Sequence, residues 1–144
     1  MQDLINLLHT THCSLVVESQ GEVRTYCKKG VRDLVWLLDN EPGRLVGARF
    51  ADKVVGKASA GLLVHGGVRE VYAQVMSRLA VPLLQQAGIP FSYPTLVDRI
   101  VLPEGDKRCP LEQIVAPAQT PQEVEQLLRE HFAEMQRNNN KPNT

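Results

Sequence analysis

The sequence predicts an α/β fold in which helices cover both faces of a mixed sheet, as a three-layer α/β/α sandwich. Two extended segments separated by a turn open the chain, and strand patterns then alternate with helical patterns. The 144 residues suffice for one domain and are too few for two ordinary ones. We expect a lead-in helix within residues 1–13, a single α/β domain over 14–137 and a disordered tail over 138–144.

The first third of the chain predicts a helix, a hairpin and a second helix. Gln20-Gly21 separates the two extended segments and is a good turn signal for a hairpin. Apolar residues then recur at helical spacing from Val31 to Leu38, and Pro42-Gly43 ends that helix. In chain order, the first helix and the two hairpin strands are expected over residues 3–9, 14–19 and 22–28.

The segment 47–67 predicts a helix that is buried against the sheet but carries charges in an unusual place. Residues 52–65 are mostly small or apolar, and Gly66-Gly67 ends the helix. Lys53 and Lys57 fall in its first two turns, four residues apart, so they share a face and repel by roughly 0.2–0.5 kcal/mol. The helix dipole also disfavours cations at this end. Two cations placed against these electrostatic preferences inside a core helix indicate a functional site.

The rest of the chain predicts a strand, a helix, two further strands and two final helices. Thr120, Pro121 and Glu123 combine a cap, a first-turn proline and a capping-box acid, which is a strong signal for the start of the last helix. The other elements are expected over residues 70–76, 77–86, 91–93 and 99–102, with a short helix opening at 109–110.

Composition excludes several classes of function. Sixteen basic residues balance sixteen acidic ones and aromatic residues make up 5%, so nucleic-acid binding is not expected. Three cysteines without CxxC spacing argue against a disulfide framework or a cysteine zinc site. The N-terminus lacks the pattern of a signal peptide, and no segment approaches the length of a membrane span. We expect a cytoplasmic protein.

Five residues are candidates for a site, and each also has a structural interpretation. Asp52 either caps the buried helix or serves as an acid in a pocket. Lys53 and Lys57 line an anion site at the helix N-terminus, or they pair with nearby acids. Cys109, at a helix start, is either a reactive thiolate or a small buried residue. Ser77 is expected to cap the next helix.

Three blocks in this order resemble a small family, domain of unknown function 1893, over Ser14–Val124; they are ADKVVGKA, GGVREVYAQVMS and CPLEQIV. That family looks like an offshoot of the cytidine deaminase superfamily, so the resemblance implies the deaminase α/β/α sandwich with the Asp52 helix at its centre. Deaminases start that helix with His-x-Glu and the next with Pro-Cys-x-x-Cys, which together hold and use zinc. Residues 51–53 read Ala-Asp-Lys and 77–80 read Ser-Arg-Leu-Ala, so no zinc, other metal or cofactor is expected, and Ser77 falls at the former metal corner.

The leading hypothesis is a protein that binds a small anion or nucleotide-like metabolite on a metal-free deaminase-like fold, through Lys53, Lys57, Ser77 and the helix N-terminus. One alternative is an enzyme with Cys109 as nucleophile, or Lys57 as amine nucleophile or base, and Asp52 in proton transfer. A third is an oligomeric interaction module with a degenerate site. We expect a homodimer, and we expect Lys57→Met to abolish anion binding without destabilising the ligand-free protein.

Overall fold

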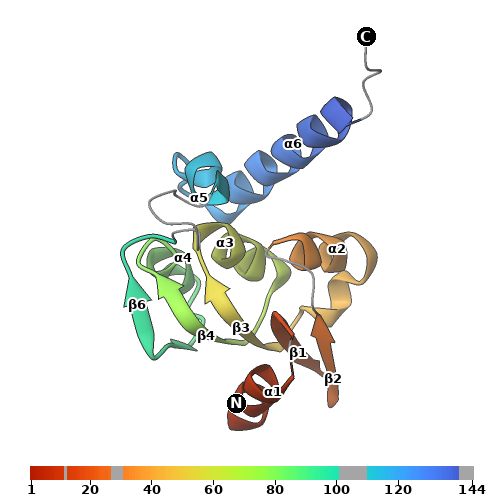
Figure 1. The fold of residues 1–144 in the computed structure, drawn as a ribbon, viewed down its shortest axis with the longest axis vertical. Coiled ribbons are helices and arrows are strands. Elements are labelled where there is room, and N and C mark those ends of the chain that lie inside the picture. The colour runs from red at the N-terminus through yellow and green to blue at the C-terminus, as the bar shows by residue number, and fades with distance from the viewer. Residues whose placement is uncertain (12, 27–30, 101–109, 140–144) are drawn as a thin grey trace.

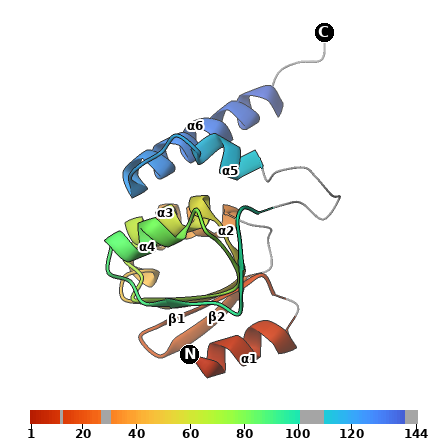
Figure 2. The same cartoon turned by 90° about the vertical axis from the view of Figure 1, so that its left-hand side faces the viewer.

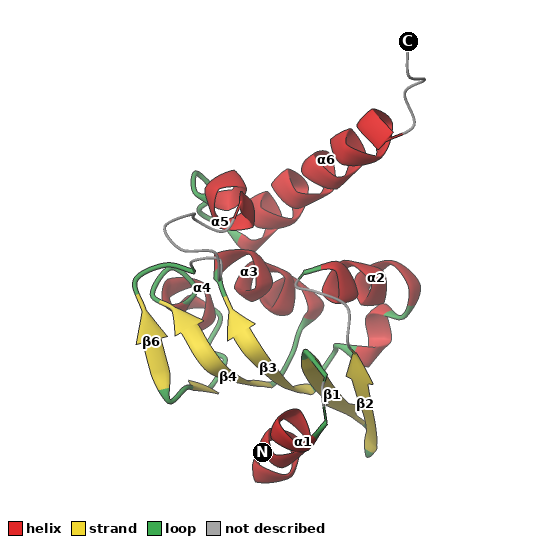
Figure 3. Cartoon of the chain, in the orientation of Figure 1, coloured by secondary structure: helices red, strands yellow, loops and turns green. Residues whose placement is uncertain are grey.

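The computed structural model describes residues 1–11, 13–26, 31–100 and 110–139. In this part of the chain, six strands form one mixed sheet (Figure 3). The sheet runs in the order β2-β1-β3-β4-β5, and β6 pairs with β4 beyond the end of β5. β1 is antiparallel to β2 and β3, whereas β3, β5 and β6 are parallel to β4. The strands are β1 Leu15–Ser19, β2 Glu22–Tyr26, β3 Arg49–Val55, β4 Glu70–Ser77, β5 Phe91–Ser92 and β6 Thr95–Val97.

Helices lie on both faces of the sheet, which confirms the predicted α/β class (Figures 1 and 2). α1 packs on β1 and β3 on one face, and α2, α3 and α4 lie on the other. α5 and α6 form a further layer outside α3 (Figure 2). None of the described helices is long and apolar enough to cross a membrane. The helices are α1 Gln2–Thr10, α2 Arg32–Asn40, the 3-10 helix η1 Pro42–Arg44, α3 Lys57–Gly66, α4 Val81–Gln86, α5 Pro110–Val115 and α6 Pro121–Asn139.

The sheet separates a large core from a small one. Adjacent residues of a strand face opposite sides, so Phe50 joins the large core under α2, α3 and α4 while Ala51 joins the small core under α1. The small core is completed by Leu4 and Leu8 of α1. The first half of β3 is therefore buried on both faces, as is usual for a strand inside a mixed or parallel sheet.

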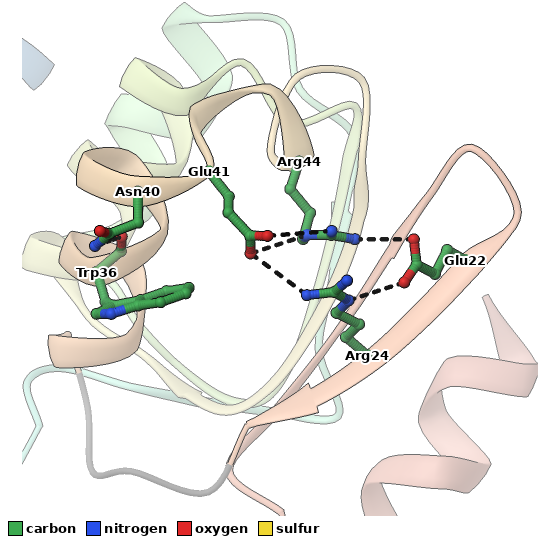
Figure 4. A network of polar contacts seen from close by, with 6 residues as sticks. All are labelled: Glu22, Arg24, Trp36, Asn40, Glu41 and Arg44. Atoms are coloured by element: carbon green, nitrogen blue, oxygen red, sulfur yellow. Dashed lines mark hydrogen bonds and ion pairs between the residues drawn. The ribbon is translucent and has the colours of Figure 1, made fainter.

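The predicted hairpin is present, and ion pairs tie it to the end of α2. Gln20 and Gly21 have φ values of 53° and 82°, as a two-residue hairpin turn requires at both positions. Figure 4 shows Arg24 and Arg44 placed between Glu22 of β2 and Glu41, which follows α2. Each guanidinium contacts both carboxylates, at N–O distances of 2.9–3.4 Å. These four charges satisfy one another, so the network joins the hairpin to the helical layer.

The prediction of one helix over residues 52–65 was wrong. Residues 49–55 form β3, Gly56 is extended, and α3 begins only at Lys57. β3 pairs with β4 along its length and with β1 over residues 49–52, so hydrogen bonds to segments distant in sequence decide its conformation. Its apolar and small residues fit a buried strand as well as a buried helix, which periodicity alone does not separate. The end of the helix was predicted correctly, since Gly67 has the left-handed φ of 81° typical of a C-terminal glycine.

Smaller differences occur in the second half. α4 begins at Val81 and not at residue 77, because Pro82 is suited to a first helical turn and Ser77 still belongs to β4. The strand expected at 99–102 is replaced by β6, and residues 101–102 lie outside the described part of the chain. α6 extends to Asn139, and the predicted tail from residue 140 onward also lies outside it.

α3 is covered on its outer side by α6, and glycine makes this contact close. A Cβ added at Gly61 would lie 2.5–2.9 Å from three side-chain atoms of Val124. His65 Nε2 of α3 also lies 2.6 Å from Glu125 Oε2 of α6. The small residues of segment 47–67 were expected to allow packing of the buried helix against the sheet. At Gly61 they allow helix–helix packing instead.

The start of α6 is capped as predicted. The Thr120 hydroxyl accepts a hydrogen bond from the Glu123 N–H at 3.1 Å, and the Glu123 carboxylate accepts one from the Gln119 N–H at 3.1 Å. The two side chains thus satisfy backbone donors at the first turn, as in a capping box.

Candidate functional site

The candidate site lies where the parallel strands β3, β4 and β6 end and α3 begins. In α/β sheets, ligands usually bind outside the carboxyl ends of the parallel strands. β3 ends at Val55, and after Gly56 the first turn of α3 starts with Lys57. The free N–H groups of a first helical turn give this end of α3 a partial positive charge.

Two cavities open at this edge of the sheet, with volumes of about 240 and 580 Å³. They share the wall formed by Asp98 and Arg99, which follow β6. The larger one is otherwise apolar, with Val54, Val75, Val97 and Ile100 around it. The smaller one combines charged, amide and apolar groups, from Leu79, Asp98, Arg99, Glu112, Gln113 and Ala116. This mixture makes the smaller cavity the better candidate for a ligand.

Among the described residues that line the smaller cavity, Glu112 of α5 is the buried charged one. Its side chain is only 6% exposed, and its Oε2 accepts a hydrogen bond of 2.8 Å from the Ile100 N–H. Its other oxygen, Oε1, is buried and has no hydrogen-bond partner among the described residues. A Cβ added at Gly56 would lie 2.8 Å from Oε1, so the carboxylate rests directly against the residue before α3.

Glu112 was not among the residues predicted for the site. It belongs to the block CPLEQIV, in which it is the one charged residue, between Leu111 and Gln113. A single charged residue in a mostly apolar block was the available signal, but nothing local in the sequence places that block beside α3.

Lys57 lies at the predicted edge, but its ammonium group is already hydrogen-bonded within the protein. Its Nζ donates a hydrogen bond of 3.0 Å to the carbonyl oxygen of Ala116, just after α5. Partial burial lowers the pKa of Lys57, and the nearby carboxylates of Glu123 and Glu112 oppose that shift. The contact joins the start of α3 to the end of α5, where a helix dipole favours a cation.

The predicted pairing of Lys53 with Lys57 does not occur. Lys53 is an exposed residue of β3, whereas Lys57 is the first residue of α3, so the two do not share a helical face. The repulsion inferred from their spacing is therefore absent, and so is an anion clamp built on that spacing.

Asp52 is buried in β3 and does not cap a helix. Burial, with a smaller contribution from the carboxylate of Asp33 in α2, raises the pKa of its carboxyl group to about 7. A hydrogen bond of 3.2 Å from the Val54 N–H to Asp52 Oδ1 acts in the opposite direction. A carboxyl group that titrates near neutral pH suits proton transfer. Asp52 is not one of the residues that line the two edge cavities, however.

Ser77 lies near the site as the buried last residue of β4. Its hydroxyl accepts a hydrogen bond of 3.2 Å from the Leu79 N–H, and the residue that caps α4 is Ala80, not Ser77 as predicted. Ser77 therefore shapes the turn that presents Leu79 to the smaller cavity. At the rim, Arg78 Nε lies 2.7 Å from Asp98 Oδ1.

Cys109, the proposed nucleophile, lies outside the described residues. Among those that are described, no three or more His, Cys, Asp or Glu side chains are grouped so that they could hold a metal ion.

We expect Lys57→Met to lower the free energy of unfolding by about 1 kcal/mol, because the Ala116 carbonyl loses its hydrogen-bond donor. This is the opposite sign to the expectation from sequence. Lys53→Met is the matched control, since it removes the same charge from an exposed strand position and should change stability little. Urea unfolding of both variants measures the difference. A Lys57→Met protein as stable as the control would show that the contact with α5 contributes nothing.

We expect Asp52→Asn to remove a pH dependence of stability. The folded pKa of about 7 lies above the ordinary pKa of an aspartate, 3.8, so between these values the folded protein holds a proton that the unfolded chain has lost. Wild-type stability should therefore fall, relative to Asp52→Asn, as pH rises through this window, by as much as about 4 kcal/mol. Above pH 7 the difference should stay constant. Urea unfolding across this pH range measures it, and parallel curves for the two proteins would contradict the assignment.

Comparison with known proteins identifies the family. A family model described as "Domain of unknown function (DUF1893)" matches residues 3–132. The crystal structure of a DUF1893 family protein from Thermotoga maritima is similar, with a TM-score of 0.82 and 25% identity over 91% of this chain and 88% of that chain. RibD from Acinetobacter baumannii gives a TM-score of 0.43 and 19% identity over 64% of this chain and 33% of its own, a likeness too distant to support an argument. Among the curated proteins, no match is found. Because the family model spans most of the sequence, the chain belongs to the DUF1893 family.

Proposed function

We propose that this DUF1893 protein binds a small, nucleotide-like metabolite in the smaller cavity at the carboxyl edge of the sheet. The observation that carries the proposal is a cavity of about 240 Å³ lined by the buried carboxylate of Glu112, which has an oxygen without a hydrogen-bond partner among the described residues. Pockets for drug-sized ligands usually measure about 300–1,000 Å³. The cavity therefore suits a group the size of a nucleobase.

The residues that line the cavity can contact both the flat ring and the polar groups of such a ligand. Leu79 and Ala116 supply apolar surface for a flat ring, while Glu112 and Gln113 supply polar groups. The exposed guanidinium of Arg99 belongs to the wall shared with the larger cavity. An anionic group that extends from the first cavity toward the second would meet this cation, and guanidinium binds phosphate and carboxylate well. In this arrangement Arg99 replaces the two lysines as the anion-binding group.

Besides the raised pKa of Asp52, which lies away from the cavities, the enzymatic alternative is supported by the pKa of Lys57. Burial lowers the pKa of Lys57, which increases the fraction of neutral amine available as a base or nucleophile. Lys57 is bound to the Ala116 carbonyl, however, and is not among the residues that line the cavity. Binding is therefore the better supported function. Homodimer formation and the role of Cys109 stay predictions.

The test is binding of nucleoside monophosphates, with inorganic phosphate as a second probe. We expect at least one nucleotide to raise the melting temperature of the wild type, by a stabilisation of about 1.4 kcal/mol at tenfold excess over its Kd. Backbone amide shifts of Leu79, Arg99 and Gln113 should change with it. Leu79→Trp fills the cavity and should abolish both effects.

Val23→Trp is the matched control, because Val23 and Leu79 are 41% and 42% exposed and Val23 lies in the distant hairpin strand β2. This variant should respond to the nucleotide as the wild type does. Failure of every nucleotide to shift the cavity amides, or equal binding by Leu79→Trp, would overturn the proposed function.

A further inference from the structure

The larger cavity at the carboxyl edge of the sheet has an aliphatic lining that the proposed nucleotide site does not use. Its volume is about 580 Å³, and small-molecule sites usually measure about 300–1,000 Å³. The branched side chains that line it belong to Val54 of β3, Val75 of β4, Val97 of β6 and Ile100, which follows β6. Three neighbouring strands thus contribute to one aliphatic surface.

These side chains do not pack in either hydrophobic core of the described residues. Val55 and Met76, the next residues of β3 and β4, belong to the large core, so Val54 and Val75 point to the opposite face of the sheet. Val54 and Val75 lie opposite each other in the parallel register, and Val54 is 41% exposed. The two valines therefore form an apolar pair on the outer face.

α1 covers a different part of this face. It packs nearer the start of β3 and β4, where Ala51 and Tyr72 belong to the small core. Figure 1 shows α1 beneath β1, away from the arrowheads of β3, β4 and β6. None of the described helices contributes a residue to the larger cavity. Apolar surface that is gathered in this way and rimmed by polar residues is typical of a binding site.

The rim of the larger cavity has one uncompensated positive charge. Arg99 lines the cavity, is exposed and forms no ion pair with the residues that the structure describes. The carboxylate of the neighbouring Asp98 is instead paired with Arg78, whose Nε lies 2.7 Å from Asp98 Oδ1. A guanidinium is always protonated in proteins, and it binds a carboxylate through two parallel hydrogen bonds.

We propose that the larger cavity is a separate site for a small aliphatic carboxylate, whose chain contacts the four branched side chains and whose carboxylate binds Arg99. A monoanion suits this rim better than a phosphate dianion, because the carboxylate of Asp98 is next to the guanidinium. The site goes beyond the nucleotide function, since the three valines do not line the smaller cavity. Because Arg99 lines both cavities, the two ligands would compete for it.

The experiment titrates the protein with hexanoate, hexanol and acetate, which present the chain with the charge, the chain alone and the charge alone. We expect hexanoate to shift the backbone amides of Val54, Val75 and Val97. It should bind at least about tenfold more tightly than either of the other probes, because only hexanoate uses both parts of the site. The amide of Gln113, which lines only the smaller cavity, should shift less.

Two pairs of variants test the two parts of the site. Val54→Ser should weaken hexanoate binding about tenfold, because two methyl groups leave the cavity. Val23→Ser is its control, since Val23 is also 41% exposed but lies in β2. Arg99→Gln should weaken hexanoate binding about tenfold, to the level of hexanol, whereas Arg69→Gln removes an exposed charge before the opposite end of β4 and should not. Thermal melts confirm that each variant is folded.

The outcomes separate this inference from the proposed function. Hexanoate binding that Val54→Ser and Arg99→Gln weaken, and that both controls preserve, supports the assignment. Equal binding of hexanol and hexanoate, or an equal loss in a control, overturns it, as does the absence of any shift of the valine amides. Nucleotide shifts at Leu79 and Gln113 without a response to hexanoate would overturn this inference alone, and the reverse result would overturn the nucleotide function alone.

Discussion

The close approach of α6 to α3 at Gly61 is the contact on which the candidate site depends. A side chain at this position would lie 2.5–2.9 Å from Val124, so the two helices reach their separation only with glycine here. α5 is joined to α6 by a short turn, and both helices pack on α3. The position of α6 thus determines the position of α5, which carries Glu112. Gly56 has the same role just before α3, where the absence of a side chain leaves room for the Glu112 carboxylate.

The chemistry at the carboxyl edge of the sheet depends on two helix ends that lie close together there. The start of α3 and the end of α5 carry partial charges of opposite sign, and the bond from Lys57 to the Ala116 carbonyl links them. Because Lys57 is used in this way, the structure does not offer a free lysine pair for an anion. It offers a cavity to which Glu112 contributes a buried side chain and Arg99 an exposed guanidinium. The guanidinium is the group suited to an anionic part of a ligand.

Elements with local signals were predictable from the sequence, and those that depend on distant partners were not. The hairpin turn at Gln20-Gly21 and the cap at Thr120 involve only a few neighbouring residues, so their sequence patterns were sufficient to predict them. β3 was mistaken for a helix because its pairing with β1 and β4 is invisible in its own residues. Lys57 directed the sequence prediction to the edge where the candidate cavities lie, but the spacing argument behind it does not hold in the structure. Glu112 was missed because its place depends on packing between helices far apart in the sequence.

The most direct measurement is the effect of Gly61→Ala on stability and on the position of Glu112. Alanine favours a helix over glycine by about 1 kcal/mol, so a net loss of stability can only come from the contact with α6. We expect a loss of about 1–3 kcal/mol in urea unfolding, together with changed amide shifts at Glu112 and Gln113. Gly43→Ala, where an added Cβ meets nothing within 4 Å, should be neutral and leave these shifts unchanged. A Gly61→Ala protein as stable as this control, with unmoved Glu112 signals, would contradict the dependence of the site on the α3–α6 contact.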